Sequence, residues 1–306
     1  MSDQTATSHD FAALSDGMAD AVQRAAASTV RVQARRGPPA SGIAIAADLV
    51  LTADHVVDAS REDAIRLGLP DGSEVAATLA GRDPATDLAL LRVAGGGLTP
   101  ATGADGEPRT GSLALAVARP GAEPAASLAL ITGLGGPART RRGGVLERFI
   151  GVDVVLYPGF SGGPLVAPSG AVLGMNTSGL GFGGPGVAVP WALTRRLAET
   201  ISQHGRVPRG YLGVGSQPVT LAQAAKDLLG GQERGLLVVQ VADGGPAAQA
   251  GMLQGDILVR LGSASVTNAD DLQGILGPDR VGSTVAASVV RGGALQELTV
   301  TVGTRQ

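Results

Sequence analysis

A serine in a glycine-rich turn is the residue of this chain best suited to nucleophilic chemistry. Ser161 lies in the sequence Gly159-Phe160-Ser161-Gly162-Gly163-Pro164. A free serine hydroxyl is a weak nucleophile at neutral pH, and it becomes reactive when an oriented histidine takes its proton. Two upstream segments offer the partners, with His55 in Leu51–Val57 and Asp87 in Asp83–Leu90. These residues form a candidate catalytic set if the fold brings them together.

The glycine motif alone is weak evidence, because a chain with 47 glycines in 306 residues can produce it by chance. Histidine is more informative, since the chain contains only three. His9 lies in a polar stretch, and His204 lies at the end of an expected helix. His55 directly follows the strand-like run 49–52, a place where a rigid strand leads into a functional loop. We therefore expect His55 to be the base rather than a solvated or packed histidine.

Two other carboxylates compete with Asp87 as the partner of the histidine. Asp54 adjoins His55 in the sequence, but neighbours in an extended chain point their side chains in different directions. Asp83 precedes Pro84 and is placed to cap that turn. Asp87 is therefore the favoured partner. The resulting order of histidine, aspartate and serine is that of the chymotrypsin arrangement.

A nucleophile elbow of the α/β-hydrolase type is the main alternative for the glycine-serine motif. That fold needs a helix directly after the serine, followed by an acid and a histidine. Here the turn leads into the strand-like pair Leu165-Val166, and the downstream pair, Glu199 and His204, lies on one expected helix end. The elbow is therefore disfavoured.

Composition excludes several classes of function. The net charge is −3, which gives no electrostatic footprint for nucleic acid, and there is no cysteine for disulfides or thiolate metal sites. The three scattered histidines do not form a metal motif, so we expect no metal and no cofactor. No apolar run reaches the roughly 18–20 residues of a membrane helix. Acidic residues interrupt residues 1–28, so no signal-peptide core is present and the chain as written is expected to be cytoplasmic. A trimmed N-terminus would instead allow a periplasmic protein.

The pattern along the chain indicates two domains of different character. Residues 1–28 are expected to be a polar lead followed by a short alanine-rich helix. Residues 29–205 contain many short strand-like runs broken by glycine, proline and aspartate, which indicate a β-barrel or sandwich. A helix over Trp191–His204 closes this part. The expected strands are 30–33, 42–46, 49–52, 64–69, 74–80, 88–93, 113–118, 128–134, 152–156, 164–166, 171–176 and 186–189.

The last third of the chain predicts a small α+β module. Residues 206–210 form a linker, and residues 211–306 contain two helix signals and several strands. Gly245–Gly251 has a proline in its first turn and a glycine at its end, and Asn268 is a helix N-cap for a helix ending at Leu276. Strands are expected at 257–261, 281–290 and 298–302.

Taken together, these motifs resemble the HtrA/Deg family of trypsin-like serine proteases with one C-terminal PDZ domain. The resemblance covers about residues 29–306. It implies a mainly β fold, with a chymotrypsin-like double barrel of two six-stranded barrels followed by the PDZ domain. The segments that carry it are Thr52–Val57, Asp83–Leu91, Gly159–Leu165, Arg209–Val214, Gly245–Gly251 and Gly255–Leu258.

The resemblance also implies roles for the residues of the catalytic set. Ser161 would be the nucleophile, His55 the general base and Asp87 the group that orients His55. The backbone N–H groups of Gly159 and Ser161 would form the oxyanion hole. Phe160 departs from the small polar residue that the family commonly has, and its ring could reshape this turn or cover the site.

Specificity and peptide binding follow from the same resemblance. Val155 and Leu156 would line the primary pocket, and the absence of an acid there favours small or medium aliphatic side chains. The segment Tyr211, Leu212, Gly213 and Val214 would bind a peptide's terminal carboxylate, after which the peptide adds as a β-strand. A buried strand start with a packing glycine is the alternative for that segment.

Two functions of different classes follow. The first is an endopeptidase that cleaves unfolded or misfolded proteins and recognises peptide C-termini, with homotrimers by family analogy. The second is a catalytically silent peptide-binding or chaperone-like scaffold. Cleavage of unfolded casein and labelling by a serine-reactive probe distinguish the two, because a scaffold neither cleaves nor labels.

Overall fold

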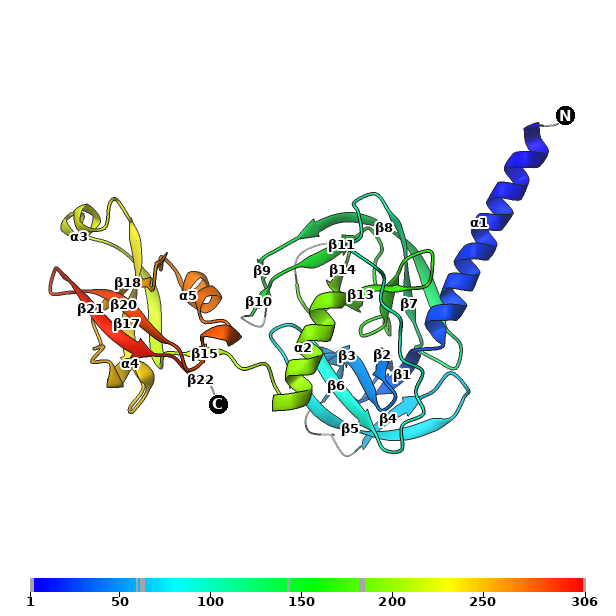
Figure 1. The fold of residues 1–306 in the computed structure, drawn as a ribbon, viewed down its shortest axis with the longest axis horizontal. Coiled ribbons are helices and arrows are strands. Elements are labelled where there is room, and N and C mark those ends of the chain that lie inside the picture. Colours follow the sequence, from blue (N-terminus) through cyan, green and yellow to red (C-terminus); the bar gives the residue numbers. More distant parts are fainter. Residues whose placement is uncertain (1–2, 59, 61–63, 142–143, 182–184, 305–306) are drawn as a thin grey trace. The chain divides into compact units, whose positions relative to one another are not determined.

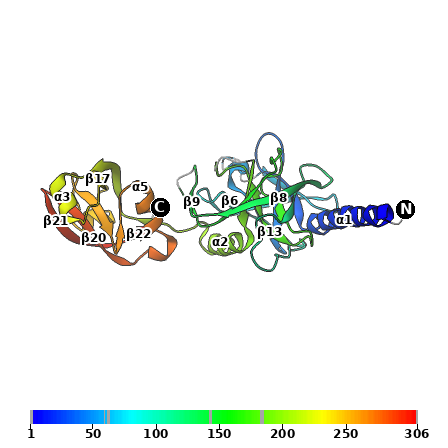
Figure 2. The same ribbon diagram turned by 90° about the horizontal axis from the view of Figure 1, so that it is seen from above.

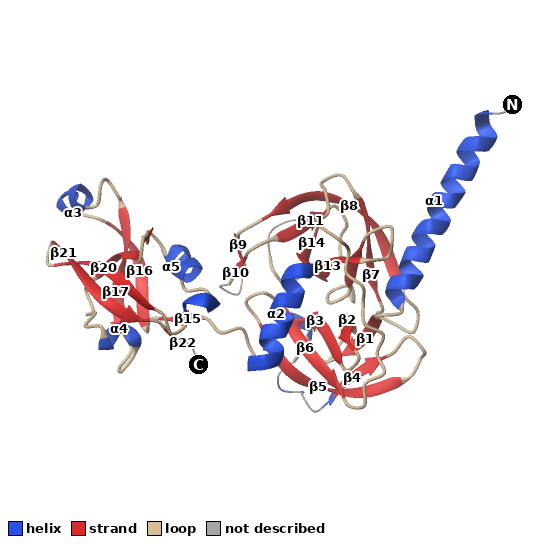
Figure 3. Ribbon diagram, viewed as in Figure 1, coloured by secondary structure: helices blue, strands red, loops and turns tan. Residues whose placement is uncertain are grey.

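The computed structural model describes residues 3–58, 60, 64–141, 144–181 and 185–304. The chain divides into two compact units, Met1–Val207 and Pro208–Gln306. The division falls inside the segment 206–210 that the sequence indicates as a linker. Strands make up most of the regular structure in the described ranges of both units (Figure 3). The expectation of a mainly β protein is confirmed.

The first unit contains two closed six-stranded barrels, as the resemblance implies (Figure 1). The first barrel has the strand order β1-β2-β3-β6-β5-β4, and β1 pairs with β4 to close it. The second has the order β11-β14-β13-β12-β7-β8. The bounds in the first barrel are β1 (Thr29–Gln33), β2 (Ala40–Ala46), β3 (Leu49–Ala53), β4 (Ile65–Gly68), β5 (Glu74–Asp83) and β6 (Leu88–Val93). Those in the second are β7 (Leu113–Ala118), β8 (Ala125–Gly135), β11 (Phe149–Val152), β12 (Pro164–Val166), β13 (Val172–Thr177) and β14 (Gly186–Pro190).

The barrels are filled mainly with aliphatic side chains. Every residue of β3 is buried, and β8 alternates between buried Ala129 and Ile131 and their exposed neighbours. Such alternation marks a strand with one face on the core and one face in water. A two-stranded ladder of β9 (Ala138–Arg139) and β10 (Val145–Leu146) accompanies the second barrel.

One predicted strand is wrong. The sequence indicates a strand over 152–156, but β11 ends at Val152 and the following residues form a loop. The apolar residues of this segment favour a strand, but Asp153 lies among them, and its carboxylate accepts a hydrogen bond from the Leu130 amide at 2.7 Å. The Asp153 amide also donates to the Leu130 carbonyl at 3.2 Å, and the loop toward Ser161 begins after this residue.

The N-terminal region also differs from the expectation. The helix α1 (Asp3–Ala26) begins at Asp3, so the polar lead is itself helical (Figure 2). Alanine is frequent here and proline is absent, which favours a helix despite the low hydrophobicity. The end of α1 packs on strands β1, β7 and β12 and buries Ala21, Ala25 and Ala26. No helix in the described ranges is both long enough and apolar enough to cross a bilayer.

The helix α2 (Trp191–His204) has the predicted bounds. It begins after Pro190 and ends at Gly205, which has a φ of 72° and donates its N–H to the Ile201 carbonyl. A glycine reaches this left-handed conformation without a steric penalty. Leu193, Leu197 and Ile201 lie one turn apart on the buried face and join a core that contains residues of both barrels.

The second unit is a sheet covered by short helices, as expected for a small α+β module. Its strand order is β16-β17-β18-β20-β21, with β19 added beside β18 and a separate β15-β22 pair. Asn268 is the N-cap of α5, since its side chain accepts from the amides of Asp270 and Asp271. The bounds are β15 (Gly210–Tyr211), β16 (Val214–Thr220), α3 (Gln223–Leu228), β17 (Arg234–Val241), α4 (Pro246–Gln249), β18 (Ile257–Leu261), β19 (Ala264–Ser265), α5 (Ala269–Ile275), β20 (Thr284–Arg291), β21 (Ala294–Thr301) and β22 (Gly303–Thr304).

Candidate active site

Asp87 and His55 are held together at the ends of adjacent strands of the first barrel. His55 lies in the short 3-10 turn Asp54–Val56 that follows β3, and Asp87 directly precedes β6. β3 pairs with β6 along its whole length, from Leu49 opposite Arg92 to Ala53 opposite Leu88. This register places the residues just beyond the two strand ends beside each other. The Asp54 amide donates to the Asp87 carbonyl at 3.1 Å and fixes the two turns together.

The carboxylate of Asp87 orients the imidazole of His55. Nδ1 of His55 lies 3.0 Å from Oδ1 and 2.8 Å from Oδ2 of Asp87, and the His55 amide also donates to Oδ1 at 2.9 Å. Asp87 is fully buried, whereas the His55 side chain is 18% exposed. Such a contact fixes Nδ1 as the protonated nitrogen, which leaves Nε2 to accept a proton. Asp87 has a φ of 59°, the sole positive φ among described non-glycine residues. Strain of this kind is concentrated at functional sites.

The two competing carboxylates have other partners. Oδ1 of Asp54 lies 2.5 Å from Nε of Arg82. Oδ2 of Asp83 accepts from the Thr86 hydroxyl at 2.5 Å, inside the turn that leads to Asp87. Asp54 and Asp83 therefore position the backbone around the dyad, and Asp87 is the carboxylate that is hydrogen-bonded to the imidazole.

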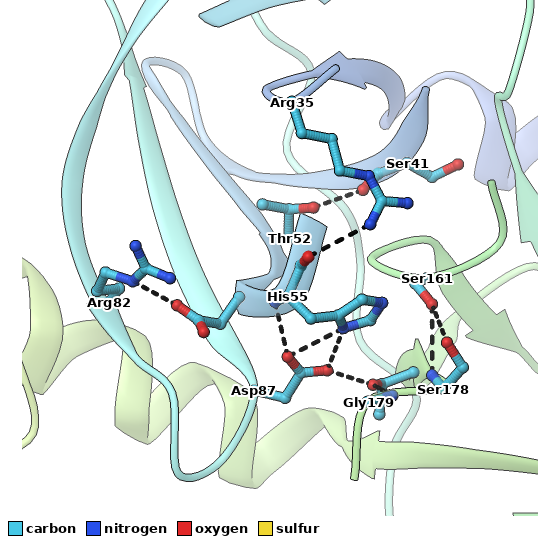
Figure 4. A network of polar contacts seen from close by, with 11 residues as sticks. Arg35, Ser41, Thr52, His55, Arg82, Asp87, Ser161, Ser178 and Gly179 are labelled. Carbon is cyan, nitrogen blue, oxygen red and sulfur yellow. Dashed lines mark hydrogen bonds and ion pairs between the residues drawn. The ribbon is translucent and has the colours of Figure 1, made fainter. Parts of the chain in front are cut away.

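Ser161 approaches the dyad from the second barrel (Figure 4). The imidazole of His55 lies between the Asp87 carboxylate and the turn that carries Ser161. The Ser161 hydroxyl lies 3.1 Å from Oγ of Ser178, and the Ser178 amide donates to it at 3.3 Å. Within the described residues it has no hydrogen bond to His55. In this structure the Ser161 hydroxyl is therefore hydrogen-bonded to Ser178 rather than to the imidazole.

The glycine-rich turn has the backbone properties of an oxyanion hole. Gly159 has a φ of 96°, and a Cβ there would lie 2.6 Å from Cβ of Pro120, so the position requires glycine. The Phe160 amide donates to the Tyr157 carbonyl at 3.0 Å. The flanking amides of Gly159 and Ser161 have no acceptor among the described residues. The Gly159 and Ser161 amides therefore lie on either side of the hydrogen-bonded Phe160 amide, and both can donate to an oxygen on which negative charge develops.

The Phe160 ring does not cover the Ser161 hydroxyl, because it points into the core of the second barrel. Its side chain is 5% exposed and belongs to the core of the second barrel with Leu165 and Ile150. The ring of Tyr157 meets it edge-on, with centroids 6.2 Å apart. Phe160 thus anchors the catalytic turn, because its ring is buried in the core of the second barrel.

The two expected pocket residues lie in different surroundings. Val155 is 61% exposed, whereas Leu156 is partly buried against the core of the second barrel. A Cβ added to Gly186 would lie 3.5 Å from Cγ of Leu156, so these residues face each other. A pocket for a substrate side chain can therefore form on the side of the loop where Leu156 faces Gly186.

The expected carboxylate loop of the second unit lies at the start of an edge strand. Among the described strands β16 pairs only with β17, so its other edge is unpaired, and α5 lies beside it. Leu212 is buried, Gly213 has a φ of 81°, and their carbonyls accept from Ala247 and Ala242 at 2.8 and 2.7 Å. The amides of Leu212 and Gly213 donate to no described acceptor. Tyr211 lies in β15 and Val214 begins β16.

Sequence reasoning missed four residues that contact the catalytic set. The Thr177 hydroxyl donates to Oδ2 of Asp87, the Ser178 hydroxyl and amide contact Ser161, and Gly179 packs against Asp87 and His55. Ser41 contacts the turn itself. The first three lie at or directly after the end of β13, so the same strand-end signal that identified His55 could have indicated them.

Comparison with known proteins agrees with this geometry. A family model described as a trypsin-like peptidase domain matches residues 40–175, and one described as a PDZ domain matches residues 210–302. The chain is 37% identical over 275 residues to a probable periplasmic serine endoprotease DegP-like of Ectopseudomonas mendocina, and 35% identical over 270 residues to its counterpart in Pseudomonas putida strain W619. Each match covers 86% of this chain but 56% and 55% of the relatives, so the chain spans about half of their length.

Solved structures match over nearly the whole chain. The HtrA-type protease AlgW with tripeptide is 32% identical, with a TM-score of 0.72, and the match covers 94% of this chain and 97% of that one. AlgW with decapeptide gives a TM-score of 0.73 at 28% identity, with 94% and 99% covered.

Proposed function

Because the chain belongs to the HtrA family of trypsin-like serine proteases with a PDZ domain, we propose that it is a serine endopeptidase acting on unfolded or misfolded polypeptides. The observation that carries the proposal is the buried Asp87 carboxylate on Nδ1 of His55, beside a serine whose turn offers two unpaired amides. This set of groups is what acyl transfer to a serine requires.

In the proposed mechanism, Ser161 attacks the scissile carbonyl while Nε2 of His55 takes the hydroxyl proton. Asp87 keeps Nδ1 protonated and stabilises the imidazolium that forms. The amides of Gly159 and Ser161 bind the oxygen of the tetrahedral intermediate, and His55 then gives its proton to the leaving amine. Water hydrolyses the acyl-enzyme by the same steps. Loss of one oxyanion donor typically costs about 3–4 kcal/mol of transition-state stabilisation.

A catalytically silent scaffold is the alternative, and the Ser161 contact with Ser178 is the observation in its favour. Two measurements on the full chain separate the functions. An endopeptidase cleaves fluorescently labelled unfolded casein and is labelled by a fluorophosphonate probe, and Ser161→Ala removes both signals. If the native chain neither cleaves nor labels, the endopeptidase proposal fails.

We propose that Leu156 contributes to a primary pocket for small or medium aliphatic side chains, with Val155 at its exposed rim. No acid lies in residues 154–158, and Leu156 is apolar and half-buried. Leu156→Ala deepens such a pocket, so in a peptide library the preferred side chain at the cleaved position becomes larger. Leu128→Ala, which shortens an exposed leucine of β8, is the matched control and keeps the native preference. Cleavage strictly after basic residues contradicts this assignment.

We propose that the second unit binds peptide C-termini at Tyr211, Leu212, Gly213 and Val214. The free amides of Leu212 and Gly213 suit a carboxylate, and the open edge of β16 suits an added strand. A fluorescent random decapeptide mixture with free C-termini then binds the full chain more tightly than the same mixture with amidated C-termini. Equal binding of the two mixtures contradicts the proposal.

We further propose a periplasmic location and a homotrimer, following the relatives and the family. The similar curated proteins are named as periplasmic. Cell fractionation of the native host tests the location, and light scattering of the purified chain tests the assembly. Recovery in the cytoplasm contradicts the first, and a monomeric mass contradicts the second.

A further inference from the structure

Ser41 in β2 is a buried serine whose polar groups all have partners, and two of these partners lie in the catalytic turn. Its side chain is fully buried. The Ser41 hydroxyl donates to the Gly159 carbonyl at 2.7 Å, and the Ser41 amide donates to the Ser161 carbonyl at 3.1 Å. The Ser41 carbonyl accepts from the Thr52 hydroxyl at 2.7 Å (Figure 4). One residue of the first barrel thus holds both residues whose amides form the proposed oxyanion hole.

The direction of the Ser41 hydroxyl is fixed by a fourth contact. The Arg119 amide donates to Oγ of Ser41 at 2.8 Å. A serine hydroxyl has a single proton to donate. Because the Arg119 amide takes a lone pair of this oxygen, the proton points to the Gly159 carbonyl. The hydroxyl therefore bridges the end of β7 and the catalytic turn as an acceptor on one side and a donor on the other.

Arg119 is itself firmly anchored. Its side chain is 4% exposed and donates to the carbonyls of Thr29 and Ala26 at 2.8 and 3.0 Å, from Nε and Nη2. Pro120, the next residue, packs against Gly159. Pro120 therefore restrains Gly159 by direct packing. Arg119 restrains it indirectly, because its amide orients the Ser41 hydroxyl that donates to the Gly159 carbonyl.

A glycine-rich turn needs such restraint. Glycine adopts many backbone conformations, so Gly159 and Gly162 do not by themselves fix the direction of the amides between them. A bound carbonyl fixes the plane of its peptide unit. The carbonyls that Ser41 holds belong to the Gly159–Phe160 and Ser161–Gly162 peptide units, which lie on either side of the unit that carries the Ser161 amide. The orientation of the turn is therefore tied to β2 rather than left to the turn's own residues.

We propose that Ser41 is a positioning residue that holds the oxyanion turn in its active shape. This inference rests on the proposed endopeptidase function. Ser41 does not touch substrate, and it acts through the carbonyls of Gly159 and Ser161. Its loss affects the transition state more than substrate binding, because the oxyanion forms only as the carbonyl is attacked.

The test compares Ser41→Ala and Ser41→Cys with Ser28→Ala in the full chain. The thiol of Ser41→Cys fills the space of the hydroxyl but bonds weakly. Ser28 is a matched control, because it is a buried serine whose hydroxyl bonds to the Ala25 carbonyl at 3.1 Å, away from the turn. Casein hydrolysis gives kcat and KM, and hydrogen exchange by mass spectrometry follows the peptide covering residues 157–163.

We expect both Ser41 variants to lower kcat by about tenfold or more with little change in KM, and to speed exchange in residues 157–163. Ser28→Ala leaves both unchanged. The proposal is overturned if a folded Ser41 variant keeps native exchange in the turn, or if its kcat matches that of Ser28→Ala. Hydrogen exchange needs no activity, so it tests the role of Ser41 even if the native chain does not cleave casein. Absence of casein cleavage would count against the proposed function alone.

Discussion

The hydroxyl of Thr177 donates a hydrogen bond to Oδ2 of Asp87, the oxygen that also lies 2.8 Å from Nδ1 of His55. Thr177 ends β13 of the second barrel, whereas Asp87 belongs to the first. The Gly179 amide in turn donates to Oγ1 of Thr177 at 2.9 Å and sets the direction of the hydroxyl. The carboxylate is thereby held from both barrels, so the orientation of the imidazole depends on how they pack together.

Replacement of Thr177 by valine tests this contact. Thr177→Val keeps the shape of the side chain but removes the hydroxyl, so one oxygen of a buried carboxylate loses a donor. We expect kcat/KM for casein to fall by about 10- to 150-fold, since one charge-assisted hydrogen bond is worth roughly 1.5–3 kcal/mol. Thr194→Val is the matched control, because Thr194 is fully buried and its hydroxyl bonds to the Trp191 carbonyl in α2. Equal losses in the two variants would show that the effect is merely structural.

Gly179 leaves no room for a side chain beside the dyad. A Cβ at this position would lie 2.5 Å from Oδ2 of Asp87 and 2.6 Å from Nδ1 of His55. Gly179→Ala must therefore push the two groups apart, and we expect a loss of at least about a hundredfold in the rate of fluorophosphonate labelling, as for ångström-scale displacements of catalytic groups. Gly133→Ala in β8 meets nothing within 4 Å and should label at the native rate. Native labelling of Gly179→Ala would refute this geometry.

The aromatic anchor of the turn predicts a loss of stability. Phe160 is buried in the second barrel, so Phe160→Ala leaves a cavity that typically costs about 3–5 kcal/mol of unfolding free energy. Urea unfolding of the first unit, followed by the fluorescence of Trp191, measures this loss. Phe160→Leu retains much of the volume and should lose clearly less. A native unfolding midpoint for Phe160→Ala would contradict the anchoring role.

The sequence predicts the strands and the catalytic set for identifiable reasons. Aliphatic alternation and glycine stops locate most barrel strands, and α2 has both a proline start and a glycine end. His55 and Asp87 lie at strand ends, and the β3–β6 register then brings them together. Signals of this kind are local in the sequence, which is why they could be read from it.

The parts that could not be predicted depend on contacts between distant segments. Ser41 lies 118 positions from Gly159, and Thr177 lies 90 positions from Asp87. The strand end of β13 marks Thr177 as a candidate, but neither residue has a local pattern that identifies its partner. Just beyond the end of β11, the Asp153 carboxylate likewise accepts from the amide of a residue in β8. Long-range hydrogen bonds of this kind require the barrels to be closed before they can be recognised.

Asp256 links two parts of the second unit through an ion pair in which the carboxylate is buried and the Arg291 side chain is 30% exposed. Its side chain is 1% exposed and accepts from Nε and Nη2 of Arg291, both at 2.7 Å, and from the Leu253 amide at 2.8 Å. Burial is the largest single influence and raises the pKa of Asp256. The hydrogen bonds from Arg291 and Leu253 lower that pKa, and their combined effect exceeds the effect of burial. The net result is a pKa of Asp256 below its ordinary value of 3.8.

The lowered pKa of Asp256 predicts that acid destabilises the second unit. A carboxyl group whose folded pKa lies below its unfolded pKa contributes stability that is fully present above the unfolded value. The contribution is lost as the pH falls through the folded value. We therefore expect the calorimetric unfolding temperature of the second unit in the full chain to be constant from about pH 7 to 5 and to fall below about pH 4, near the unfolded pKa of aspartate.

The Asp256→Asn variant tests this assignment. It should unfold at a lower temperature than the native chain at pH 7, and its unfolding temperature should fall less on acidification, because it has no carboxyl group to protonate. The exposed Asp243→Asn is the control and should keep the native profile. An acid dependence of Asp256→Asn as steep as that of the native chain would show that other groups carry it.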